Sequence, residues 1–138
     1  MAICTYNVDG INADTLKKTD SITKMFEEMI TNDIIVINLQ EVDMSLNKLF
    51  SSKLDGKFIL WKDYLYKIFK NENFYSDSWA LGTIMMNCFF NRKASNYIKY
   101  YEIRGNFLGE FGPLLLGNKA AIALHVIYLK KRYILTLK

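Results

Sequence analysis

The stretch from Asp33 to Ser45, with the sequence DIIVINLQEVDMS, decides the fold of this chain. Its apolar residues are mostly β-branched and too few to span a membrane, so they predict a strand buried on both faces, as in the centre of a parallel sheet. Gln40 and Glu41 stand at the carboxyl end of this strand. Ligands bind at that edge of open α/β sheets, because the loops that leave the strands diverge there. A carboxylate at such a place needs solvent, a paired charge or a cation, so Glu41 is the first candidate functional residue.

The residues before this strand predict a β-α-β unit. Ala2 to Val8 is strand-like and runs into the turn-prone cluster Asn7 to Gly10. A helical stripe of apolar residues follows, with the spacing i, i+3, i+4, i+7 and i+8: Ile22, Met25, Phe26, Met29 and Ile30. Such a unit requires parallel strands, so we expect Asn7 to lie at the same edge of the sheet as Glu41.

The middle of the chain predicts a covering helix and then further strands. Apolar residues from Phe58 to Ile68 share one helical face, and Trp61 on that face is expected in the core. The region 79–90 is strand-like, 91–93 resembles a turn, and 97–103 is strand-like again. We expect these to be antiparallel strands at the side of the sheet.

The region from Gly105 to Gly117 is the longest loop-like part of the sequence, and two strands follow it, ending in the apolar run 133–137. Between loop and strands lies Gly117-Asn118-Lys119-Ala120-Ala121. Glycine lets a backbone approach a ligand closely, asparagine offers an amide, and lysine offers a charge suited to phosphate. The alternative is a tight turn capped by Asn118, with Lys119 in solvent.

Composition indicates one folded domain. The chain has 138 residues, of which 51% are hydrophobic and 23% charged, and its formal net charge of +4 comes from cations spread along the sequence, which implies a modest preference for anionic partners. Cys4 and Cys88 lie in apolar runs without metal-binding spacing, so reduced core thiols in an intracellular compartment are expected. Because the sequence stops within an apolar strand, we expect the domain to be truncated at its C-terminus.

Three segments in this order resemble the inositol polyphosphate 5-phosphatase catalytic domain, a member of the endonuclease/exonuclease/phosphatase superfamily. They are Thr5 to Gly10 (TYNVDG), Leu39 to Ser45 (LQEVDMS) and Gly117 to Ala123 (GNKAAIA). The Gln-Glu pair marks the whole superfamily, whereas the Gly-Asn-Lys turn is similar to that of the phosphatases. The resemblance covers nearly all of residues 1–138 but only the N-terminal half of the family's domain.

The resemblance implies an α/β fold, namely half of a two-sheet α/β sandwich with a mixed sheet and covering helices. It further implies that Glu41 and Asn7 are catalytic residues that hold Mg²⁺, and that Asn118 and Lys119 bind the substrate. The expected activity is Mg²⁺-dependent hydrolysis of the 5-phosphate of soluble inositol phosphates or phosphoinositides. Hard oxygen ligands suit Mg²⁺, and a lysine neutralises further phosphate charge. Because this half supplies mainly one sheet, we expect its inner face to be exposed and the isolated chain to be marginally stable or prone to aggregation.

Departures from the family pattern keep other functions open. The family's Asp-x-Asn motif, which supplies the water-activating base, is absent from this sequence, and the single histidine, His125, is expected to be hydrogen-bonded or surface-facing because no acidic partner stands beside it in sequence. One alternative is a non-catalytic remnant that binds phosphoinositide or a partner protein. A second is a related metal-dependent nuclease, although no nucleic-acid partner is expected. The expected location is the cytoplasm, with peripheral contact to a membrane surface as an option.

Overall fold

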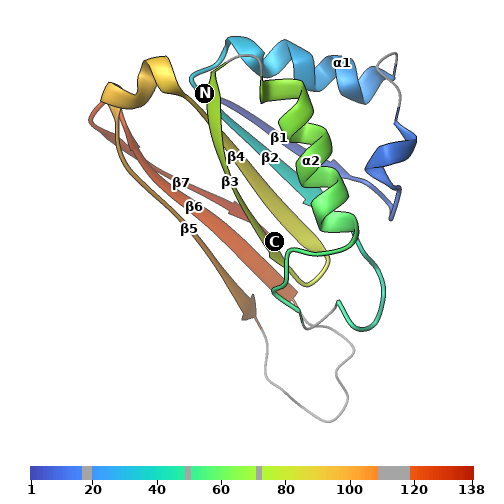
Figure 1. Cartoon of the computed structure of the whole chain (residues 1–138). Helices are drawn as coiled ribbons and strands as arrows, with labels where there is room; N and C mark the ends of the chain where they lie inside the picture. The colour runs from blue at the N-terminus through green and yellow to red at the C-terminus, as the bar shows by residue number, and fades with distance from the viewer. Residues whose placement is uncertain (17–19, 49–50, 71–72, 109–118) are drawn as a thin grey trace.

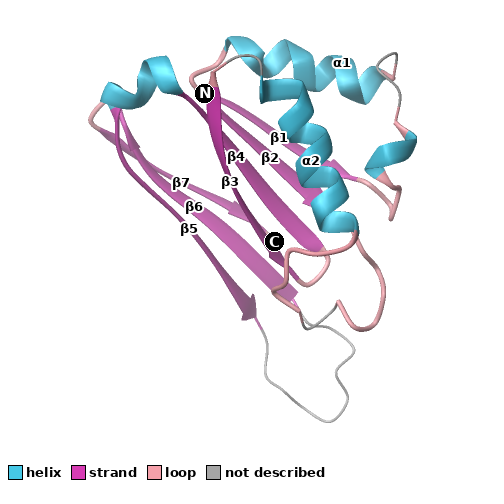
Figure 2. Ribbon diagram, in the orientation of Figure 1, coloured by secondary structure: helices cyan, strands magenta, loops and turns pink. Residues whose placement is uncertain are grey.

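The structure is a computed structural model that describes residues 1–16, 20–48, 51–70, 73–108 and 119–138. In these residues two sheets pack face to face, and helices cover the outer face of the first sheet (Figure 1, Figure 2). The first sheet has the strand order β1-β2-β4-β3 and contains β1 (Ala2–Asn7), β2 (Ile34–Gln40), β3 (Phe74–Leu81) and β4 (Ile84–Asn91). The second has the order β5-β6-β7 and contains β5 (Ile98–Leu108), β6 (Lys119–Tyr128) and β7 (Lys131–Leu137). The helices are α1 (Ser21–Glu28) and α2 (Lys57–Phe69), with short 3-10 turns η1 (Ala13–Thr15), η2 (Met29–Thr31) and η4 (Arg92–Tyr97).

The predicted β-α-β unit is present. β1 and β2 are parallel, Asn7 pairs with Gln40, and α1 lies between the two strands in the chain. All residues from Ile34 to Leu39 are buried, which confirms that β2 is covered on both faces. Alternation along the strand explains this burial, because Ile35 and Ile37 face the helices while Val36 faces the second sheet.

Two cores therefore flank the first sheet. The helix-side core contains the predicted face of α2 together with residues of α1 and the sheet, and Trp61 is only 1% exposed within it, as expected. The core between the sheets is lined mainly by Ile34, Val36, Met86, Cys88 and Phe90 from the first sheet and by Ile122, Leu124, Val126 and Leu137 from the second. Each core buries large side chains that would otherwise face water, which is the main favourable term in folding.

The prediction that this chain supplies mainly one sheet, with an exposed inner face, is wrong. The three strands of the second sheet cover the inner face of β2 and β4. The predicted place of the strands after residue 79 is also wrong, because β4 lies beside β2 in the middle of the first sheet and residues 98–108 belong to the second. Local patterning identifies a strand but does not select its partner, since pairing depends on contacts distant in sequence.

Two smaller segments also differ from expectation. The predicted turn at 91–93 is the start of η4, and the predicted loop from Gly105 begins inside β5. A side chain at Gly105 would meet the Trp79 indole, since an added Cβ would lie 2.6 Å from Trp79 Nε1. Gly105 thus allows close packing of the two sheets rather than marking a loop.

The two cysteines are free, with Cys88 buried and Cys4 half-buried, as the sequence indicates. Burial raises the pKa of both thiols, so neither is activated as a nucleophile. No helix within the described ranges is long and apolar enough to cross a membrane.

Candidate functional site

Asn7 and Glu41 come together at one edge of the first sheet. Asn7 is the last residue of β1 and Glu41 follows the last residue of β2. Beyond the strands, the backbone amide of Val8 donates to the Gln40 carbonyl (2.9 Å) and the amide of Gly10 donates to the Glu41 carbonyl (2.8 Å). The two loops are thereby held side by side, and the predicted neighbouring placement of Asn7 and Glu41 is confirmed.

The backbone at this edge has unusual conformations. Glu41 has a φ of 56° and Asp9 a φ of 47°, both in the left-handed region that L-residues with a Cβ rarely adopt. Such a conformation costs about 1 to 2 kcal/mol per residue. At Glu41 this left-handed conformation ends strand β2 and changes the direction of the chain. Backbone strain of this kind concentrates at functional sites.

The loop after β1 is anchored by helix α2. Lys57 Nζ donates a hydrogen bond to the Gly10 carbonyl (2.7 Å), and Trp61 Nε1 donates to the Ile11 carbonyl (3.0 Å). Lys57 and Trp61 are four residues apart, so they lie on the same face of the helix. The Asn7 side chain is also fixed within this loop, because its Oδ1 accepts a hydrogen bond from the Asp9 amide (2.9 Å). Neither Lys57 nor Trp61 was identified as a site residue from the sequence, since their partners lie about fifty positions away.

A second acidic residue, Asp43, follows Glu41 by two positions. Asp43 accepts hydrogen bonds from the Ser45 hydroxyl (2.7 Å) and amide (3.1 Å). Partial burial alone would raise the pKa of Asp43, but these two hydrogen bonds and the charges of Lys57 and Lys48 together lower it. Asp43 therefore stays ionised at neutral pH and adds negative charge beside Glu41.

These donors fit a hard divalent cation in kind but do not form a complete cage. Carboxylate and amide oxygens are the ligands that Mg²⁺ uses, commonly one or two from the protein with the remainder from water and substrate. Among the residues that the structure describes, no group of three or more His, Cys, Asp or Glu side chains could hold a metal ion. Asn7 and Glu41 are thus suited to an open site completed by other ligands.

The predicted substrate-binding residues are placed only in part. Asn118 lies outside the described residues, and of Lys119 only the backbone is described, as the first residue of β6. The start of β6 lies at the same end of the molecule as Glu41, because Ile122 pairs with Leu137 and Gln40 Nε2 donates to the Lys138 carbonyl (3.2 Å).

His125 lies away from this edge, on the outer face of the second sheet. Its ring meets the Tyr100 ring edge-on at 5.4 Å, and its Nε2 is buried without a hydrogen-bond partner. Glu102 is directly opposite His125 on β5, so an acidic residue that is not beside His125 in sequence is its neighbour across the strands. Sequence reasoning missed Glu102 because cross-strand register was unknown. Glu102 itself is occupied by Tyr100 Oη (2.8 Å) and Arg104 Nε (2.7 Å), which makes this a surface network rather than a catalytic pair.

Two sheets pack face to face, helices cover the outer face of the first sheet, and the parallel strands β1 and β2 end at a polar edge. This arrangement defines the sandwich of the endonuclease/exonuclease/phosphatase type. The family model for endonuclease/exonuclease/phosphatase family 2 matches residues 4–137, and the chain belongs to that family. Among curated proteins, none matches this chain.

A solved structure has the same fold. It is the crystal structure of the inositol polyphosphate 5-phosphatase domain of SPsynaptojanin in complex with inositol (1,4)-bisphosphate and calcium ion, with a TM-score of 0.65 and 19% sequence identity. The match covers 97% of this chain and 38% of the SPsynaptojanin chain. The chain therefore corresponds to well under half of that relative, and the likeness establishes the partial sandwich fold.

Proposed function

We propose that the Asn7–Glu41 edge is the metal- and phosphate-binding edge of a Mg²⁺-dependent phosphatase that removes the 5-phosphate from inositol phosphates or phosphoinositides. One observation carries the proposal: Glu41 leaves its strand in a left-handed conformation directly beside the end of β1, where Asn7 stands. Membership of the phosphatase-containing family supports it, as does the solved relative that holds an inositol bisphosphate and a divalent cation.

Each residue has a distinct role in this proposal. The Glu41 carboxylate and the Asn7 amide oxygen hold Mg²⁺, while Asn118 and Lys119 bind the phosphate and the inositol side of the substrate. When bound, Mg²⁺ neutralises charge on the transferred phosphoryl group and lowers the pKa of a coordinated water. The ionised Asp43 keeps the edge attractive to a cation at neutral pH.

No residue is assigned as the general base, because the Asp-x-Asn motif of the phosphatases is absent from these 138 residues. What we propose for the chain by itself is binding of the metal and of phosphate. Hydrolysis is proposed for the phosphatase domain to which such an edge belongs.

Magnesium binding tests the proposal directly. We expect Mg²⁺ titrated into the chain to shift the NMR amide signals of Asn7, Glu41 and their neighbours. Glu41→Gln keeps the size of the side chain but removes its charge, and should weaken Mg²⁺ binding at least about tenfold, because the carboxylate is the principal hard ligand. Glu28→Gln, an exposed position on α1, is the matched control and should bind as the unmodified chain does. Equal binding by both variants would refute the assignment of Glu41.

Phosphate release then separates the two sources of substrate and the non-catalytic alternative. One arm supplies soluble inositol 1,4,5-trisphosphate, and the other supplies vesicles that contain phosphatidylinositol 4,5-bisphosphate, each with and without Mg²⁺. Release that disappears in Glu41→Gln identifies a minimal enzyme and its preferred source. Mg²⁺ and inositol phosphate binding without release identifies a binding remnant, and a chain that binds neither contradicts the proposal.

A further inference from the structure

The turn that joins β6 to β7 has a conformation that does not suit its residues. Leu129 and Lys130 are its two central residues, between the paired Tyr128 and Lys131, and their φ angles are 50° and 64°. Two-residue hairpin turns with positive φ at both positions favour Asn-Gly, because these residues tolerate the left-handed region. A leucine there is strained, and packing does not compensate, since Leu129 is 51% exposed. Natural proteins depart from such local rules mainly at functional or strained sites.

The turn and the segment that it contacts are strongly basic. Residues 92–99 and 129–132 contain no Asp or Glu, and they carry six exposed cations: Arg92, Lys93, Lys99, Lys130, Lys131 and Arg132. The two segments meet at one end of the molecule, because the Leu129 amide donates to the Tyr97 carbonyl at 3.0 Å (Figure 1). We refer to residues 92–99 and 129–132 together as the basic tip.

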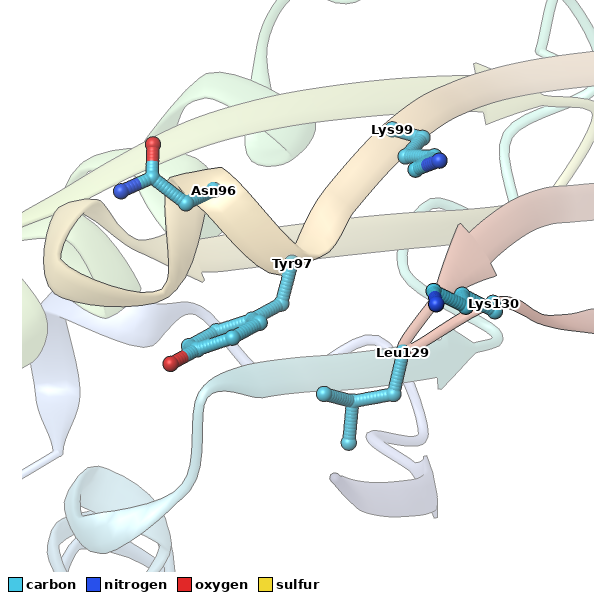
Figure 3. A pocket seen from close by; sticks show the side chains of 5 residues that line it. All are labelled: Asn96, Tyr97, Lys99, Leu129 and Lys130. Atoms are coloured by element: carbon cyan, nitrogen blue, oxygen red, sulfur yellow. The ribbon is translucent and has the colours of Figure 1, made fainter.

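The basic tip also presents apolar surface. Tyr97 is 55% exposed, and with Leu129 it lines a shallow hollow of about 250 Å³ whose other lining residues are Asn96, Lys99 and Lys130 (Figure 3). In Figure 3 the side chains of Tyr97 and Leu129 lie on the same side of the hairpin turn, Lys130 lies beside Leu129, and Lys99 projects separately from β5. An exposed aliphatic and aromatic pair within a ring of cations is the pattern of surfaces that enter the interface of an anionic bilayer.

We propose that the basic tip binds an anionic lipid bilayer. The side chains of Leu129 and Tyr97 enter the boundary between headgroups and acyl chains, and the lysine and arginine side chains contact lipid phosphates. Tyrosine is suited to this boundary because its ring is apolar and its hydroxyl remains hydrated. Charge attraction alone would not account for a strained, exposed leucine at the apex of the turn, which favours a bilayer over a nucleic acid or an acidic protein.

This proposal does not rest on the proposed function. Tyr128 Oη donates to Asp33 Oδ2 (2.5 Å), which places the tip beside the residue before β2, whereas Glu41 is the residue after β2. The seven residues of β2 separate the two ends by about 23 Å. A bilayer at the basic tip would leave the Asn7–Glu41 edge facing away from it, toward soluble ligands.

Vesicle co-sedimentation of the 138-residue chain tests the proposal. We expect binding to vesicles of phosphatidylcholine mixed with phosphatidylserine, little binding to phosphatidylcholine alone, and weaker binding as salt concentration rises. The decisive variant is Leu129→Asn with Lys130→Gly, which installs the preferred turn residues. It should raise the midpoint of thermal unfolding yet reduce binding to the mixed vesicles more than about fivefold, the factor that corresponds to loss of one lysine near the surface.

Further variants separate the two parts of the surface. Leu129→Asn alone keeps every charge and should still weaken binding. Lys53→Gln should leave it unchanged, because Lys53 is exposed and lies near Ser51, which contacts the β3–β4 turn at the other end of the first sheet. Unchanged vesicle binding by Leu129→Asn would overturn the proposal. So would tighter binding to double-stranded DNA than to mixed vesicles, because the basic tip would then be a nucleic-acid surface.

Discussion

Glu41 and Lys57 illustrate how single residues shape the candidate edge. Glu41 was identified from the sequence because its chemistry follows from local context, a polar residue directly after a buried strand. Lys57 was not identified, because its bond to the Gly10 carbonyl joins residues that no local pattern relates. The residues predicted at the edge are therefore those that lie at the ends of strands. The residues that were missed are those whose side chains hold the loops in place.

Lys57 should position the loop after β1 for metal binding. Lys57→Met keeps most of the apolar stem and leaves the Gly10 carbonyl without its charged donor, so we expect the free energy of unfolding to fall by about 1 to 2 kcal/mol, measured by chemical denaturation. If Lys57 acts by positioning the loop, this variant should bind Mg²⁺ more weakly, even though removal of a positive charge would by itself favour cation binding. Tighter Mg²⁺ binding would instead show that Lys57 acts only through its charge, and Lys67→Met controls for loss of a lysine from the same helix.

Individual elements were predictable where their periodicity is complete. The stripe on α2 and the buried run of β2 both appear in the structure as the sequence indicates. β4 is equally buried along Ile84–Phe90, and this is the pattern of a central strand, but its place between β2 and β3 depends on pairing that the pattern does not encode. Likewise, the register that sets Glu102 opposite His125 became visible only once β5 and β6 were paired.

The hydrogen bond between Tyr128, the last residue of β6, and Asp33, the residue before β2, should make the stability of the fold sensitive to high pH. The hydrogen bond to Asp33 is the largest cause that raises the pKa of Tyr128 to about 12, with burial adding to it. An unfolded tyrosine titrates near pH 10, so between about pH 10 and 12 only the unfolded chain loses this proton, and stability present below pH 10 is lost as pH rises.

Tyr128→Phe removes both the hydrogen bond and the titrating group. We expect this variant to be less stable than the unmodified chain at pH 8 and to lose less stability between about pH 9 and pH 11. The measurement is the free energy of unfolding from urea titrations at each pH. Parallel curves for the two proteins would show that the Tyr128–Asp33 bond does not persist in solution.

At the scale of the whole molecule, strand β4 contributes side chains to both hydrophobic cores. Met85 and Phe89 of β4 pack on the helix side, whereas Met86, Cys88 and Phe90 pack between the sheets. Loss of either core would expose one face of β4 and β2 to water, at a cost of roughly 25 cal/mol per Å² of apolar surface. The sequence-based expectation of an exposed inner face did not include this coupling, because the alternating residues of β6 reveal a buried face but not what buries it.

We therefore expect the described layers to unfold as one cooperative unit. The two tryptophans report on different layers: Trp61 lies in the helix-side core, and Trp79 lies against Gly105 of the second sheet. Trp79→Phe leaves Trp61 as the only tryptophan, and Trp61→Phe leaves Trp79. In each variant, tryptophan fluorescence and far-ultraviolet circular dichroism should give the same urea midpoint, because a shared β4 cannot lose one core and keep the other. A Trp79 signal that changes well before the circular dichroism would mean that the second sheet detaches while the helix layer stays folded, and the inner face would then be exposed in the way the sequence alone suggests.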